Sequence, residues 1–265
     1  MLAVAWAIDV LLGYGVAGLV IALVVVVIGT FGAYWKSDAV ALAMSHAKPA
    51  DPVEYARLHN LVEGLCIAGG LPKPRVYVIN DPAPNAFATG RDPRQAAVAV
   101  TTGLLEKMNR VELEGVLAHE LSHVKNYDIL VSTLAVTLVG VIVVMADFSL
   151  RFLWWGGPRS RDRERDGGGG PQAILALVGI VLLLLAPLAA RLMQFAVSRR
   201  REALADISGV AMTRYPPGLI AALEKLRADG AVVSGSRATA HLWIESPQSR
   251  THPTLEERIS ALKEL

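Results

Sequence analysis

Long apolar runs are the most prominent feature of the hydrophobic pattern along this chain. Residues 14–35 contain no charged side chain, and two further uncharged stretches occupy 129–146 and 173–190. Because about 20 apolar residues cross the hydrocarbon core of a bilayer as a helix, these stretches predict three transmembrane helices. They form an N-terminal anchor within residues 1–35 and a hairpin within 129–196. For the second and third stretches, a buried helical hairpin of a soluble protein is the alternative.

The polar segments between these stretches define the expected topology. An Arg- and Gly-rich loop, 156–171, joins the second and third stretches, and its composition predicts a solvated, flexible linker. Two crossings return a chain to its starting side, so residues 36–128 and 197–265 are expected to meet in one domain. The arginines at 199–201 predict that this domain faces the cytoplasm, although the loop arginines then lie outside, against the positive-inside rule.

Within the two polar parts, the hydrophobic pattern shortens to the periods of amphipathic helices and strands. Apolar residues at helical spacing alternate with short apolar runs bounded by Gly, Pro and Asn. The pattern predicts helices over 52–66, from 104, over 111–126, 206–226 and 255–265, and strands over 75–80, 85–90 and 96–102. The expected fold class is α+β, a mostly helical domain with a small antiparallel sheet, joined to about three transmembrane helices.

Composition supports the membrane interpretation and excludes other classes. The chain has 265 residues, of which 53% are hydrophobic and 19% charged; soluble domains average about 45–50% and 25%. A formal net charge of +2 gives no reason to expect a nucleic-acid partner. The single cysteine, Cys66, permits no intrachain disulfide, which fits a reducing, cytosol-facing compartment, and Cys66 itself is expected to be a core residue.

The strongest chemical signal is the sequence H-E-x-x-H at residues 119–123. Residues four apart lie on one face of a helix, so the imidazoles of His119 and His123 can reach one metal ion. Glu120 projects beside them, where its carboxylate can act as the general base of a metal-assisted hydrolysis. Such a pattern arises by chance in a chain of this length on the order of 1% of the time, so its setting decides its meaning.

Two carboxylates beyond the last apolar stretch can complete such a site. A catalytic zinc ion commonly takes three protein ligands and keeps one position open, so two imidazoles need a third donor. Glu202 and Asp206 share a helix face; Glu202 is the candidate third ligand and Asp206 the candidate acceptor for an imidazole N–H. From spacing alone, ion pairing of Glu202 with neighbouring arginines is an equally good explanation. Asp128 either supports the site or marks a helix end, and we slightly favour the helix end.

Several motifs together resemble one family, the HtpX-type integral membrane zinc endopeptidases, which are related to the CAAX prenyl proteases. The matching stretches occur in family order at 84–90, 115–126, 202–206, 238–242 and 251–259. The resemblance implies a zincin-like catalytic domain holding one Zn²⁺ through His119, His123 and Glu202, with Glu120 as catalytic base. It also implies a multi-pass protein of the cell membrane whose cytoplasmic domain cleaves misfolded or damaged membrane polypeptides, often under stress.

The resemblance extends to substrate contacts. The family's Asn-Ala-Phe strand lies at the rim of the cleft, so Asn85, Phe87 and Thr89 are implied to line an extended substrate; a purely structural strand is the alternative. The His-Pro motif near the cleft implies that His252 helps to bind the oxyanion and that Arg258 holds this segment, with a structural turn as the alternative. Two departures stand out: one complete span precedes residue 36 where the family has two, and the segment 247–251 is short.

Two other function classes are weaker. A non-catalytic membrane scaffold with a structural metal would be expected to close its site with four ligands, often cysteines, whereas three ligands and an intact Glu120 are found here. A transporter would be expected to carry charges within its spans, and the three apolar stretches carry none. The sequence therefore favours a peptidase whose partners are unfolded or membrane polypeptides and the lipid bilayer.

Overall fold

The computed structural model describes residues 35–134, 198–229 and 253–265, together with a few isolated positions. The chain divides into two compact units, of which the larger joins Lys36–Leu134 to Met193–Leu265. Nearly all described residues belong to this larger unit. The predicted spans lie almost entirely outside the described residues, and no helix within the described ranges is long and apolar enough to cross a membrane.

A four-stranded sheet forms one layer of the larger unit, with the strand order β1-β2-β4-β3. β3 pairs with β4 and β1 with β2 in antiparallel fashion, whereas β2 and β4 run parallel. The prediction of an antiparallel sheet is therefore wrong: the sheet is mixed. After β2 the chain forms β3 at the edge of the sheet and then returns as β4, which lies between β2 and β3. β4 is antiparallel to β3 and therefore has the direction of β2. The strands are β1 (Lys48–Pro49), β2 (Arg75–Ile79), β3 (Ala86–Thr89) and β4 (Ala97–Thr101).

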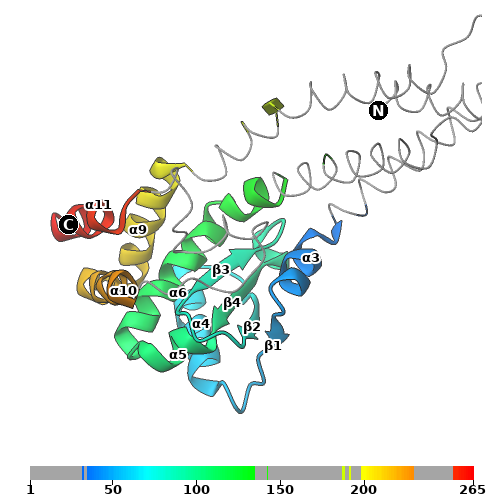
Figure 1. Ribbon diagram of the computed structural model, residues 1–265, viewed down its shortest axis with the longest axis horizontal. Helices are drawn as coiled ribbons and strands as arrows, with labels where there is room; N and C mark the ends of the chain where they lie inside the picture. The colour runs from blue at the N-terminus through cyan, green and yellow to red at the C-terminus, as the bar shows by residue number, and fades with distance from the viewer. Residues whose placement is uncertain are drawn as a thin grey trace, which may run out of the picture. The chain divides into compact units, whose positions relative to one another are not determined.

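Helices cover both faces of the sheet (Figure 1). α6 runs beside β3 and makes its most extensive contacts with α9, and α10 packs against both α6 and α11. The helices are α3 (Ser37–Met44), α4 (Ala56–Gly69), α5 (Thr102–Lys107), α6 (Arg110–Lys125), α9 (Arg199–Thr213), α10 (Pro216–Asp229) and α11 (Leu255–Lys263), with a 3₁₀ turn at Pro93–Gln95.

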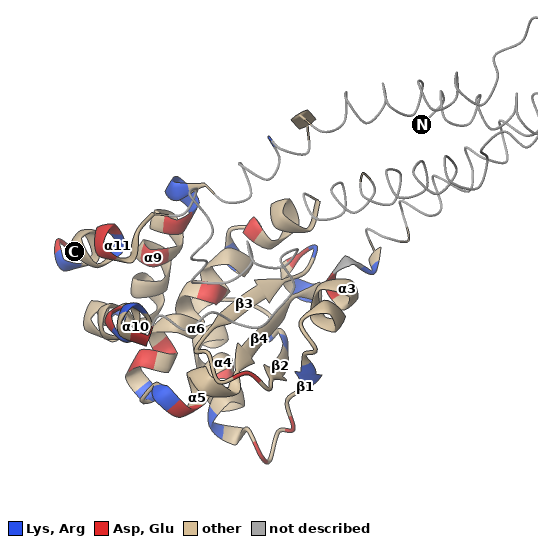
Figure 2. Ribbon diagram, in the orientation of Figure 1, with Lys and Arg blue, Asp and Glu red and all other residues tan. Residues whose placement is uncertain are grey.

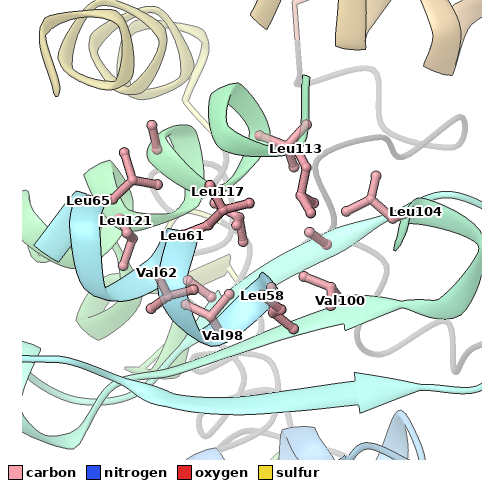
Figure 3. Packing of buried hydrophobic residues seen from close by; sticks show 14 of the residues in the cluster. Leu58, Leu61, Val62, Leu65, Val98, Val100, Leu104, Leu113, Leu117 and Leu121 are labelled. Carbon is pink, nitrogen blue, oxygen red and sulfur yellow. The ribbon is translucent and has the colours of Figure 1, made fainter. Parts of the chain in front are cut away.

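The main core lies between α4, α6 and the sheet (Figure 3). Leu58 and Val62 of α4, Leu117 and Leu121 of α6, and Val98 of β4 are almost fully buried there. Burying a Leu or Val side chain stabilises a fold by about 1.5–3 kcal/mol. This packing therefore holds α6, the helix that carries H-E-x-x-H, against a rigid sheet.

The boundaries of two helices near the site follow from local chemistry. α6 begins with a capping box, in which Asn109 accepts from the Glu112 N–H and the Glu112 carboxylate accepts from the Asn109 N–H. The single helix expected over 206–226 is instead two helices, which meet at Arg214 with φ 54°. Pro216 explains the break, because proline disfavours helical conformation in the residue before it and favours the first turn of a new helix.

Candidate metal centre

His119, His123 and Glu202 converge on one point between α6 and α9. One potential ligand atom from each lies within 4.8 Å of the others. The two Nε2 atoms are 3.2 Å apart, and the Glu202 oxygens lie 3.5 Å from His119 Nε2 and 3.7 Å from His123 Nε2. Ligands bound tetrahedrally at about 2.0–2.1 Å are roughly 3.3–3.4 Å apart. The triangle of donors therefore has the size that a zinc ion requires.

A carboxylate contacts the Nδ1 atom of each imidazole, on the side of the ring away from the other ligands. His119 Nδ1 lies 2.9 Å from Asp206 Oδ1, and His123 Nδ1 lies 2.8 Å from Asp128 Oδ2. Carboxylates accept, so both Nδ1 atoms donate, and in the neutral form of each ring the Nε2 atom carries a lone pair. Those lone pairs face each other across 3.2 Å, an arrangement that a cation stabilises. The donor set therefore fits a metal on the chemistry of its own contacts.

Burial and nearby acids set the charge of these groups. Burial, the largest influence, and Arg258 lower the pKa of His119, but hydrogen bonds with Asp206 and Glu202 outweigh them and raise that pKa to about 9. Burial raises the pKa of Glu202, yet the two histidines and Arg258 hold it well below its usual range. The carboxylate is thus ionised at neutral pH. A metal ion entering the site would displace the proton of His119.

Glu120 is 2% exposed, and burial raises the pKa of its carboxyl, partly offset by the two histidines. It sits on α6 beside the two imidazoles, within the well-packed part of the helix. A buried carboxylate with a raised pKa is a better proton acceptor than an exposed one. The position and environment of Glu120 thus match those of a general base.

Arg258 lies at the metal site, in contact with Asp206 and His119. Its side chain is buried, and its guanidinium donates to both oxygens of Asp206. Nη2 also lies 3.2 Å from His119 Nδ1, but a guanidinium only donates, so Asp206 is the acceptor for that ring nitrogen. Nη2 is also 3.5 Å from His119 Nε2, and Nη1 is 3.9 Å from a Glu202 oxygen, so Arg258 lies beside the metal ligands; that it contacts substrate stays a prediction. His252 lies outside the described residues.

The side chains of Asn85, Phe87 and Thr89 are also buried, with exposures of 4%, 0% and 3%. Phe87 packs against Leu42 and Ala99 in a second apolar cluster on the face of the sheet away from α6. Alternation along β3 turns Phe87 into the protein interior. The interpretation that these side chains line a substrate stays a prediction.

Two further residues lie at the site. Asp128 contacts His123 directly, so of the two roles that the sequence leaves open for it, support of the site has a contact in the structure. Gly209 has no counterpart among the sequence predictions. Gly209 brings α9 close to α6, since a Cβ placed there would lie 3.0 Å from the His119 amide nitrogen. The sequence signal for this close helix contact is a pair of small residues four apart, Ala205 and Gly209, on the same helix face as Glu202 and Asp206.

These features define a class. Two imidazoles and a carboxylate that converge beside a buried glutamate on the first helix are the arrangement of H-E-x-x-H metallopeptidases. The chain belongs to peptidase family M48, whose family model matches residues 52–265. The protein is therefore a metallopeptidase.

Individual relatives agree with this placement. The chain is 44% identical over 261 residues to a "Protease HtpX homolog" of Caldanaerobacter subterraneus subsp. tengcongensis, covering 95% of this chain and 86% of that relative. It is 48% identical over 241 residues to a "Protease HtpX homolog" of Tropheryma whipplei strain Twist, covering 88% and 80%.

A solved structure shows a similar fold. The crystal structure of S. mikatae Ste24p matches with a TM-score of 0.56 at 19% identity, over 98% of this chain. This chain spans 62% of the length of that one. At this identity the likeness concerns the fold alone.

Proposed function

We propose that the protein is a membrane-anchored zinc endopeptidase in which His119, His123 and Glu202 hold one Zn²⁺ and Glu120 is the general base. The observation that carries this proposal is the convergence of the three donors with both imidazole Nε2 lone pairs turned inward. Donors of the His/His/Glu type suit zinc. When bound, the zinc ion supplies Lewis-acid polarisation of a peptide carbonyl.

The residues of the chain supply proton transfer and orientation. Glu120 accepts a proton at its carboxylate from the attacking water and delivers it to the nitrogen of the leaving amine. Its buried position raises its pKa and so favours the first of these steps, acceptance of the proton. Asp206 and Asp128 hold the Nδ1 protons of the two ligand histidines, which keeps the rings in the tautomer that binds metal.

The β3 edge of the sheet is the proposed place for an extended polypeptide. β3 is the last strand in the strand order. The Thr101 N–H donates to the Asn85 carbonyl. Antiparallel alternation therefore directs the main-chain N–H and C=O groups of Asn85, Phe87 and Thr89 toward β4, and those of Ala86 and Ala88 away from it. The Ala86 N–H is already bonded to Asn85 Oδ1. Ala88 is therefore the proposed centre of main-chain pairing with substrate.

The cellular setting is proposed from the sequence. An anchor within 1–35 and a hairpin within 129–196 would place the parts 36–128 and 197–265 on the cytoplasmic side of the cell membrane. Polypeptides exposed at that surface, including misfolded or damaged membrane proteins, are the proposed substrates. Family membership supports this role, which belongs to protein quality control under stress.

Cleavage of unfolded casein by detergent-purified protein tests the proposal, with wild type and Glu120→Gln compared and bound zinc measured in both. We expect about one zinc per chain in each protein and cleavage by wild type only. Equal zinc without cleavage by either protein would favour a scaffold. Cleavage that persists in Glu120→Gln would exclude Glu120 as the base, and absence of zinc from both after loading would exclude the assigned ligands.

A further inference from the structure

Asp128 joins two elements that are far apart in the sequence. One carboxylate oxygen lies 2.8 Å from His123 Nδ1, and the other accepts from Nη2 of Arg201, 73 residues further along the chain. The Asp128 side chain is 9% exposed and that of Arg201 is 22% exposed, so the pair is largely shielded from water. A shielded, hydrogen-bonded ion pair is more strongly coupled than one at the surface.

The backbone before Asp128 shows why this contact exists. In an uninterrupted helix, five residues turn through about 500°, which would leave Asp128 roughly 140° around the axis from His123. Instead, Tyr127 adopts φ 58°, a left-handed conformation that is uncommon outside glycine. α6 ends there, and residues 128–134 continue as a new helical segment. This break turns the Asp128 carboxylate back toward the ring of His123.

The position of Arg201 also calls for an explanation. Basic residues in the first turn of a helix are opposed by the helix dipole, and α9 starts with three arginines (Figure 2). Arg199 and Arg200 are exposed, whereas Arg201 is partly buried and pairs with Asp128. Arg201 therefore differs from its neighbours in having a specific partner inside the unit.

We propose that Asp128 is a positioning residue for the metal ligand His123, and that Arg201 acts on the site by holding Asp128. The proposal rests on the proposed metal site and adds a second supported ligand to it, since Asp128 and Arg201 support His123 as Asp206 supports His119. Asp128 directly precedes the segment 129–196 and Arg201 closely follows it. The pair thus fastens the two ends of that segment, within the larger unit, to one ligand of the metal.

Metal affinity of the full-length protein in detergent tests this arrangement without relying on activity. Zn²⁺ affinity is measured by competition with a chelator, and Co²⁺ is substituted so that its visible spectrum reports ligand geometry. Asp128→Ala is expected to weaken Zn²⁺ binding about 10–100-fold and to alter the Co²⁺ spectrum. Asp128→Asn keeps an acceptor for Nδ1–H and is expected to lose less. Zinc affinity and a Co²⁺ spectrum equal to wild type in Asp128→Ala would overturn the proposal.

A double-mutant cycle separates an indirect role of Arg201 from a general effect. Arg201→Gln alone is expected to weaken zinc binding several-fold, and to add little when Asp128 is already Ala, because contacting residues are not additive. A full, undiminished effect of Arg201→Gln in the Asp128→Ala background would show that Arg201 does not act through Asp128. Arg201→Lys, which keeps the charge, is expected to recover part of the affinity.

Two controls complete the experiment. Asp229→Asn removes another ion pair of the larger unit, Lys107–Asp229 at 2.6 Å, and is expected to bind zinc as wild type does. His123→Ala is expected to bind zinc far more weakly than any Asp128 variant. If His123→Ala binds zinc as wild type does, the proposed metal site itself is wrong. If His123→Ala loses zinc but Asp128→Ala does not, the metal site holds and only the role of Asp128 is wrong.

Discussion

The guanidinium of Arg258 makes two hydrogen bonds with the carboxylate of Asp206, 2.9 Å from Nε to Oδ2 and 2.6 Å from Nη2 to Oδ1. Asp206 in turn lies 2.9 Å from Nδ1 of His119. Arg258 thus lowers the pKa of Asp206, against the effect of burial, and keeps this carboxylate available as an acceptor for the ring. The contact is local to the metal site, because Nη2 of Arg258 also lies 3.2 Å from Nδ1 of His119.

Replacing Arg258 tests this position. Arg258→Met leaves a buried carboxylate without its counter-charge, and breaking such a pair destabilises a protein by about 3–5 kcal/mol. We expect a lower melting temperature of the detergent-purified protein and weaker zinc binding. A variant with normal melting temperature and zinc affinity but a raised KM for casein would instead show that Arg258 acts through substrate binding.

Gly209 is expected to tolerate a side chain poorly. A Cβ there would lie 3.0 Å from the His119 nitrogen and 3.2 Å from the Ala118 carbonyl carbon, both backbone atoms that cannot rotate away. Gly209→Ala should therefore separate α9 from α6, lower stability by about 1–3 kcal/mol and weaken zinc binding. Gly64→Ala is the matched control, because nothing lies within 4 Å of its Cβ and alanine favours a helix interior. Equal behaviour of the two variants in unfolding and zinc titrations would contradict this account.

The pKa of His119 predicts a pH dependence in the metal-free protein. Since folding raises this pKa from 6.5 to about 9, protonated His119 stabilises the fold fully below pH 6.5, and this contribution is lost as pH rises through about 9. Zinc must displace the same proton, so apparent zinc affinity is expected to rise over the same window. Unfolding of the metal-free protein and zinc titrations at pH 6.5, 7.5 and 9 measure both effects. His119→Gln isolates the effect of pH on stability, because the difference in the free energy of unfolding between wild type and this variant should shrink toward pH 9.

Phe87 is expected to act through the core and not through substrate. Its ring is fully buried against residues that include Leu42 and Ala97. Phe87→Ala should lower the free energy of unfolding by about 3–5 kcal/mol because it leaves a cavity. At a temperature where the variant remains folded, its KM for casein is expected to equal that of wild type. A raised KM in a variant of normal stability would show that the side chain faces substrate.

Local sequence was sufficient to predict the part of the site that lies within one helix. His119 and His123 are four apart, and helical geometry alone brings their rings to one side, as the 3.2 Å between their Nε2 atoms shows. The spacing of Glu202 and Asp206 placed them on one helix face for the same reason, and both are buried there. Helical and strand periods likewise predicted most elements of the larger unit, because each depends on neighbours along the chain.

Contacts between distant segments could not be obtained in this way. Arg258 lies 139 residues from His119, and its burial follows from the packing of α11 against α9 and α10. The parallel pairing of β2 and β4 depends on where β3 is inserted, which no period along the chain encodes.

Asp128 shows the boundary between the two kinds of information. In a regular helix, a residue five positions after His123 would point away from its ring. The left-handed conformation of Tyr127 breaks the helix and turns the Asp128 carboxylate toward that ring. The sequence by itself determined the donors and the helices that present them, because side-chain chemistry and helical repeat are local properties. The tertiary structure alone decided which carboxylates and which arginine meet each ring, because those contacts depend on how helices distant in sequence pack together.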